Sequence, residues 1–271
     1  MLRKPLLTLI LLAALMLTAC DRAVPPPETT LPETITAPPI TTDTLTEAPA
    51  TTFPEETTLP ATEPPHSALY IPGLSVEDAI RYFSEVCLDA EFTNSGDSSV
   101  LQKWDTHIYY CILGNPTDTD LEVLTEFVQW LNTIPGFPGM YATDDPMEAN
   151  LDIHFCSQAE MVTQMGNRFE NMDGAVTFWY TDNRIHDAII CIRTDLNQTL
   201  RNSVILEELY NGLGPVQDTS LREDSIIYAG YSEPQELSDI DRLILQLLYR
   251  PELQCGMDAE ACAAVIRQLY D

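Results

Sequence analysis

The chain has 271 residues, of which 45% are hydrophobic, and its formal net charge is −29 at pH 7. A chain of this length forms one or two domains. Because so acidic a chain is repelled by phosphate groups, we expect no nucleic-acid partner and no attraction to anionic membrane surfaces. Any attachment to a membrane is therefore expected to be covalent.

Residues 1–19 have the pattern of a bacterial signal peptide. Arg3 and Lys4 give a positive start, and Leu6–Leu17 is an apolar run too short to span a bilayer comfortably. The run ends in Leu-Thr-Ala-Cys20, which resembles the bacterial lipobox, where the cysteine is lipidated after cleavage before it. A protein is anchored stably when two or more acyl chains, such as palmitoyl chains, are attached to it. We expect Cys20 to hold the protein on the extracytoplasmic face of a bacterial cell membrane; the alternative is an ordinary secretory signal with a chance cysteine.

Residues 20–66 comprise the lipidated N-terminus and a linker rich in Pro, Thr and Glu. Such a segment cannot bury enough apolar surface to offset the entropy lost on ordering, so we expect disorder. Its prolines favour extended polyproline conformation at about 3.1 Å per residue, a reach on the order of 140 Å. We interpret it as a stalk that holds a folded domain, residues 67–271, away from the membrane.

The domain contains apolar patterns of both helical and strand period. They predict helices from Ser75 and over 120–132, 197–212, 238–249 and 258–270, and strands over 104–113, 150–156, 174–180 and 188–192. This order of elements predicts an α+β (α/β) domain.

Six cysteines lie in this domain. Export to an oxidising compartment permits up to three disulfides among them. Cys255 and Cys262 are close in sequence around a helix start and are a candidate disulfide. The strand cysteines Cys111, Cys156 and Cys191 either pair across one sheet or remain buried free thiols.

The segment Glu207-Glu208-Leu-Tyr-Asn211-Gly-Leu-Gly214 has the layout of a zinc-protease helix without its zinc ligands. In that layout, H-E-x-x-H, two histidines one helical turn apart bind the metal and the Glu between them is the general base. Here Glu207 and Asn211 stand at the histidine positions, Glu208 keeps the base position, and Gly214 keeps the turn that ends the helix. A general base without a metal or a nucleophile has little to activate, so we expect no catalysis.

Glu207, Asn211 and Asp218 are weak candidates for metal ligands. Oxygen ligands suit Ca²⁺ or Mg²⁺ better than zinc, and all four histidines of the chain lie outside the helix. We therefore expect no cofactor, with an oxygen-ligated metal ion as the alternative.

The segment 104–249 resembles a metzincin-type metalloprotease domain. The sequence Ala-Asn-Leu-Asp-Ile-His-Phe over 149–155 is similar to the metzincin strand A-D-I-x-I-x-F. Ser225-Ile-Ile227-Tyr228 is similar to the turn under the metal, with Ile227 in the place of its methionine. The resemblance implies a twisted mixed sheet, a degenerate active-site helix, a structural turn at these residues and a helical C-terminal subdomain.

The chain also resembles DUF2927, a family of uncharacterised bacterial proteins, many of them lipoproteins. The similar segments are Ile205–Leu209, Gly212–Gly214, Asp218–Ser220, Asp224–Ile226 and Gln235–Ser238. This resemblance implies a fold and a compartment but no reaction.

In metzincins an edge strand pairs with the extended substrate, and Ala188–Ile192 resembles that strand. A protease that has lost its metal would keep this edge and bind a peptide or protein there by strand addition. We therefore expect a membrane-anchored, non-catalytic domain that binds a peptide or protein. The alternative is a divergent, metal-assisted, peptidase-like hydrolase with Glu208 as general base.

Overall fold

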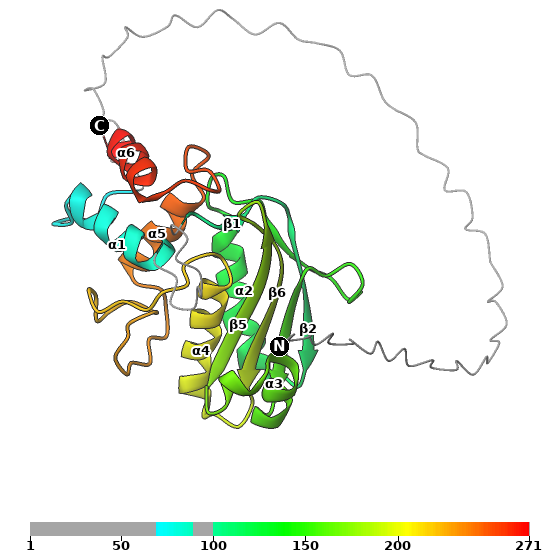
Figure 1. Cartoon of the computed structure of the whole chain (residues 1–271). Helices are drawn as coiled ribbons and strands as arrows, with labels where there is room; N and C mark the ends of the chain where they lie inside the picture. Colours follow the sequence, from blue (N-terminus) through cyan, green and yellow to red (C-terminus); the bar gives the residue numbers. More distant parts are fainter. Residues whose placement is uncertain (1–68, 89–99, 271) are drawn as a thin grey trace, which may run out of the picture. The chain divides into compact units, whose positions relative to one another are not determined.

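The computed structural model describes residues 69–88 and 100–270 (Figure 1). All of these residues lie in one unit of the chain, Leu59–Asp271. The expected signal peptide, Cys20 and linker lie outside the described residues. Within the described ranges, every helix is too short or too polar to cross a bilayer.

Six strands form one sheet, in which most neighbouring strands run parallel. The strands are β1 (Lys103–Trp104), β2 (Ile108–Gly114), β3 (Met140–Ala142), β4 (Leu151–Cys156), β5 (Gly174–Thr181) and β6 (Arg184–Arg193). Their order is β1-β6-β4-β2-β3, with every pair on this path parallel, and β5 pairs antiparallel with β6. Asp182 and Asn183 join β5 to β6 with φ of 51° and 62°. Two successive residues of positive φ are what a tight hairpin between twisted strands requires.

Six α-helices accompany the sheet in the described residues, and the expected mixed α/β fold is confirmed. They are α1 (Val76–Leu88), α2 (Asp118–Leu131), α3 (Gln158–Met165), α4 (Gln198–Asn211), α5 (Asp239–Leu248) and α6 (Ala259–Tyr270). Capping boxes built on Thr117, Ser157 and Ser238 start α2, α3 and α5. Each box satisfies backbone N–H groups that the first helical turn leaves unpaired.

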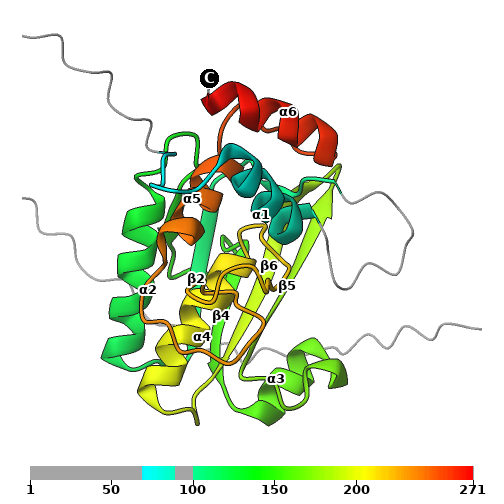
Figure 2. The same cartoon turned by 90° about the vertical axis from the view of Figure 1, so that its left-hand side faces the viewer.

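The helices divide between the two faces of the sheet and one end of the domain. The helix α4 packs on β5 and β6 and against α2, whereas α1 packs with α5 and α6. Figure 2 shows α2 and α4 side by side, with α1, α5 and α6 grouped beyond one end of them. On the opposite face, Met161 of α3 packs with Ala175 and Cys191 of the sheet.

The prediction that Ala188–Ile192 is an edge strand is wrong. Ala188–Ile192 belongs to β6, which lies between β4 and β5, so the outer strand on this side is β5. The physical reason is visible in the burial of β6, where Ala188, Ile190, Cys191 and Ile192 are all fully buried. A nearly continuous apolar run of this kind is typical of a strand covered on both faces.

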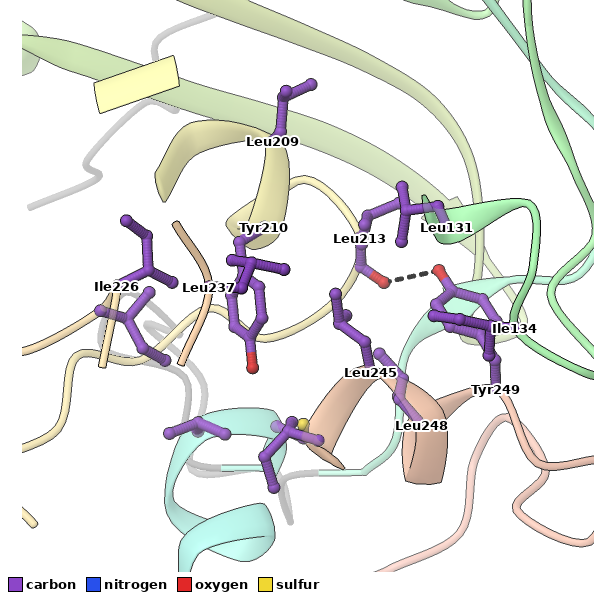
Figure 3. Close-up of a cluster of buried hydrophobic side chains, with 14 of the residues drawn as sticks. Leu131, Ile134, Leu209, Tyr210, Leu213, Ile226, Leu237, Leu245, Leu248 and Tyr249 are labelled. Atoms are coloured by element: carbon purple, nitrogen blue, oxygen red, sulfur yellow. Dashed lines mark hydrogen bonds between the residues drawn. The ribbon is translucent and has the colours of Figure 1, made fainter. Parts of the chain in front are cut away.

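Aromatic side chains fix the C-terminal end of α4 against α5. The Tyr249 hydroxyl donates to the Leu213 carbonyl at 2.8 Å (Figure 3). The Trp104 indole N–H donates to the Gly212 carbonyl at 2.9 Å, and the Tyr210 hydroxyl donates to the Asp241 carbonyl at 3.2 Å. The bonds to Gly212 and Leu213 satisfy carbonyls at the C-terminal end of α4, which a helix leaves unpaired, and the bond from Tyr210 ties α4 to the first turn of α5.

Lys103 is a buried lysine that links β1 to the end of α5. Only 8% of the surface of Lys103 is exposed. Its Nζ donates to the carbonyls of Leu248 and Arg250 at 2.7 and 3.3 Å. Burial lowers its pKa, because water no longer solvates the ammonium group.

All six cysteines of the described residues are free thiols. Cys255 and Cys262 do not form the expected disulfide in this structure, since each thiol donates to a separate backbone carbonyl, at 3.8 and 3.9 Å. Cys156 and Cys191, on neighbouring strands, do face each other. The Cys191 thiol donates to Gln164 Oε1 at 3.4 Å, and its proximity to Cys156 lowers the pKa of Cys156.

Candidate functional site

A cleft of about 770 Å³ runs between β5, the C-terminal half of α4 and the chain that follows α4. Gly174, Val176, Phe178 and Tyr180 of β5 form one wall. These residues alternate along the strand, so the side chains of Val176, Phe178 and Tyr180 share one face. Clefts of this size accommodate drug-sized molecules or short peptide segments.

A buried ion pair sets the position of α4. Arg201 of α4 donates to the Asp120 carboxylate of α2 at 2.9 Å, and both side chains are buried. Gln198 donates to the same Asp120 oxygen at 2.7 Å. Burial alone would raise the pKa of Asp120, but these bonds and the Thr117 backbone N–H lower it overall. The pair therefore fixes the angle at which α4 presents its C-terminal half to the cleft.

Glu208 lies at the base of the cleft with its side chain almost fully covered. The residue is 7% exposed, and no group in the described parts of the chain donates a hydrogen bond to its carboxyl. Its Oε1 lies 2.7 Å from where a Cβ on Gly174 would stand. Burial raises the pKa of Glu208 well above its usual range, and the charges of Glu207 and Asp218 raise it further.

Glu207 lines the same cleft and is half-buried. Burial raises its pKa to about 7, with contributions from the charges of Asp218 and Asp173. Both neighbouring carboxyl groups of α4 therefore resist ionisation, because each would place a charge in a poorly solvated site that is already acidic.

Asn211 and Asp218 complete the acidic side of the cleft. The Oδ1 atom of Asn211 is buried and has no hydrogen-bond partner within the described ranges. Asp218 is exposed and also lines the cleft. The structure thus brings together Glu207, Glu208, Asn211 and Asp218, the four polar residues that the sequence singled out.

These four residues do not fit a zinc ion. They offer three carboxyl groups and one amide, and zinc sites in proteins use imidazole or thiolate ligands for most positions. No group of three or more His, Cys, Asp or Glu side chains in the described ranges has an arrangement that would hold a metal ion.

The predicted structural turn forms the far wall of the cleft. Ser225 Oγ donates to the Asp241 carboxylate at 2.6 Å and the Ile226 N–H donates to it at 3.0 Å. Ile227 is buried, while Tyr228 lines the cleft. Asp241 also belongs to the capping box of α5, so one carboxyl group holds both the turn and the start of a helix.

Gly214 allows the chain to change direction after α4. Its φ is 129°, and a Cβ at this position would lie 2.8 Å from the Gln102 carbonyl oxygen. Only glycine combines this backbone conformation with so close an approach. The predicted role of Gly214 in the turn agrees with this geometry.

The sequence reasoning missed the β5 wall of the cleft and the contact between Gly174 and Glu208. One signal could have located the wall. Asp182-Asn183 between two predicted strands is typical of a tight hairpin. A hairpin there would have placed β5 beside β6 and left one of the two as an outer strand.

A family model described as "Protein of unknown function (DUF2927)" matches residues 77–268. The match covers the described helices and strands almost entirely. No curated protein matches the chain.

Proposed function

The chain belongs to the DUF2927 family, whose description assigns no activity, and we propose that its domain is a non-catalytic peptide-binding module. In this proposal the module is metzincin-like and is held at the extracytoplasmic face of a bacterial membrane by a lipid on Cys20. The ligand is an extended segment of a peptide or protein, bound in the cleft beside β5.

The observation that carries the proposal is the outer edge of β5 along the cleft. Among the described residues, β6 is the only strand that pairs with β5. An outer strand presents backbone N–H and C=O groups that an extended peptide pairs with as an added strand. Val176 and Phe178 of this strand line the cleft, so they would contact alternate side chains of the added strand.

The anchoring part of the proposal rests on the sequence. The positive start, the short apolar run and the cysteine at position 20 support lipidation. A linker rich in proline between Cys20 and the domain would give the cleft a long reach from the membrane surface.

Selection of peptides from a random library displayed on phage tests the binding function. Amide hydrogen exchange on the full-length protein then locates each selected peptide. We expect binding to slow the exchange of amides in β5. Tyr180→Ser should weaken binding, because Tyr180 lines the cleft. Tyr141→Ser is the matched control: Tyr141 is an equally exposed tyrosine on β3, at 47% against 49% for Tyr180. No enriched peptide, or protection confined to other strands, would contradict the proposal.

A second candidate function is a divergent hydrolase with Glu208 as general base. It is favoured by the position of Glu208, buried at the base of the cleft without a hydrogen-bond donor from the described residues. A carboxyl group with a raised pKa in a cleft is typical of catalytic acids and bases. Incubation of the wild-type protein with unstructured peptides, followed by mass spectrometry, tests this function. Cleavage that Glu208→Gln abolishes while the fold survives would replace the first proposal with this one.

A further inference from the structure

The α4 side of the cleft holds two acceptors that nothing in the described structure satisfies. The Glu208 carboxyl accepts no hydrogen bond there although the residue is only 7% exposed, and Asn211 Oδ1 is buried without a donor. Buried polar groups in proteins are nearly always paired. Two unpaired acceptors one helical turn apart therefore point to a donor that arrives with a ligand.

The groups around these acceptors are acidic, and the residues that line the cleft offer little positive charge. Glu207 and Asp218 line the cleft together with Glu208. The only basic residue among the lining residues is Arg168, whose guanidinium lies 4.5 Å from the ring centroid of Phe169 and forms no ion pair within the described ranges. A donor that also carries positive charge would therefore complement this part of the cleft.

Apolar side chains continue from the acceptors along the cleft. Val176, Val204 and Ile226 line it beside Glu208. Long basic side chains bury their methylene groups against such surfaces while the charged group meets a polar partner. The cleft thus offers both an apolar path and an acidic end.

We infer that this cleft selects its peptide through an arginine side chain, whose guanidinium is bound by Glu208, Glu207 and Asn211 Oδ1. The inference rests on the proposed peptide-binding function. Arginine fits better than lysine because its planar group presents five N–H donors and pairs with a carboxylate through two parallel bonds. Asp218, at the rim, adds to the attraction.

Isothermal titration of the full-length protein with two matched peptides tests the inference. The peptides are acetyl-Val-Arg-Val-amide and its citrulline counterpart, which has nearly the same shape and no charge. We expect the arginine peptide to bind at least about ten-fold more tightly. Glu208→Gln and Glu207→Gln should each reduce this preference. Glu122→Gln, an exposed residue of α2 outside the cleft, is the control and should leave it unchanged.

Two further probes, argininamide and Ca²⁺, separate this inference from the proposed function. Argininamide that binds in a Glu208-dependent way, when neither peptide binds, would support the arginine site and overturn peptide binding. Equal binding of the two peptides would overturn the arginine site and leave peptide binding intact. Ca²⁺ that binds through Glu208, with no binding of argininamide or of either peptide, would overturn both in favour of a cation site.

Discussion

The Glu208 carboxyl occupies a position that opposes its ionisation. An ionised carboxylate placed in poorly solvated surroundings without donors is unfavourable, so the folded state favours the protonated form. Natural proteins retain such groups mainly where binding or chemistry requires them. Glu208 is therefore expected to lower the stability of the free protein at neutral pH.

Glu208→Gln should stabilise the protein at high pH and change little at low pH. Because the pKa values of Glu207 and Glu208 are higher in the folded state than in the unfolded state, their contribution to stability is present below the unfolded pKa. It is lost as the pH rises through the folded pKa, about 7 for Glu207. Urea unfolding should show Glu208→Gln more stable than wild type at pH 8 by on the order of 1–3 kcal/mol, and nearly equal at pH 5. Equal destabilisation at both pH values would mean that Glu208 has a structural partner.

Some of the cleft residues were predictable from the sequence and others were not. Glu207, Glu208 and Asn211 were identified because the H-E-x-x-H layout that they resemble lies on one short helical segment. Gly174 was not, because its relation to Glu208 depends on the packing of β5 against α4, which are separated in the chain by β6. No local sequence pattern shows that a glycine is needed where β5 packs against α4.

The packing of α4 against α2 depends on the buried Asp120–Arg201 pair. Removal of one partner of a buried pair leaves the other charge without compensation, and this usually costs about 3–5 kcal/mol. An exposed pair, in contrast, contributes at most about 1 kcal/mol. The contact between α2 and α4 therefore depends on its charged pair, whereas α1 does not depend on its exposed Arg81–Asp78 pair.

Arg201→Met should lower the free energy of unfolding by about 3–5 kcal/mol in urea titrations at pH 7. The matched control is Arg81→Met, since Arg81 pairs with Asp78 on the surface of α1 at 3.3 Å with both side chains exposed. Because hydrogen bonds lower the pKa of Asp120 in the folded state despite its burial, its contribution to wild-type stability is present above the unfolded pKa and is lost as the pH falls below about 4. A loss as small as that of Arg81→Met would show that the pair is dispensable.

Gly174→Ala should displace β5 from α4. The added Cβ would lie 2.5 Å from Val204 Cγ1 and 2.7 Å from Glu208 Oε1, closer than atoms can pack. We expect a loss of about 1–3 kcal/mol, as for other overpacked sites, together with weaker peptide binding. Thermal unfolding and titration measure the two effects. Thr181→Ala, an exposed residue of the same strand outside the cleft, is the control, and an unchanged Gly174→Ala protein would contradict the close contact.

At the level of elements, the sequence predicted the long helices and the buried strands. Helical period and capping residues mark α2, α4 and α5, and apolar runs mark β4 and β6. The short elements α3 and β3 were missed, because eight and three residues are too few for a period to show. The position of β6 in the sheet was mispredicted, because strand order depends on contacts between distant segments.

For the whole molecule, the central prediction is attachment through Cys20. Cys20→Ala should abolish incorporation of labelled palmitate in a bacterial host and move the protein out of the membrane fraction, because the Cys20 thiol is the proposed attachment point of the lipid. Cys255→Ala is the control and should keep both label and location. Palmitate label that survives Cys20→Ala would contradict the proposed anchor.

Lys103 gives the mature protein an uncommon chemical property. It is the only lysine after Lys4, so cleavage before Cys20 would leave a chain with a single side-chain amine, buried at the end of α5. Apart from the α-amine of Cys20, acylating reagents should therefore mark one site, Lys103, and only on molecules that open. The mass increase with time would report the rate of global opening directly, in living cells as well as in a purified sample.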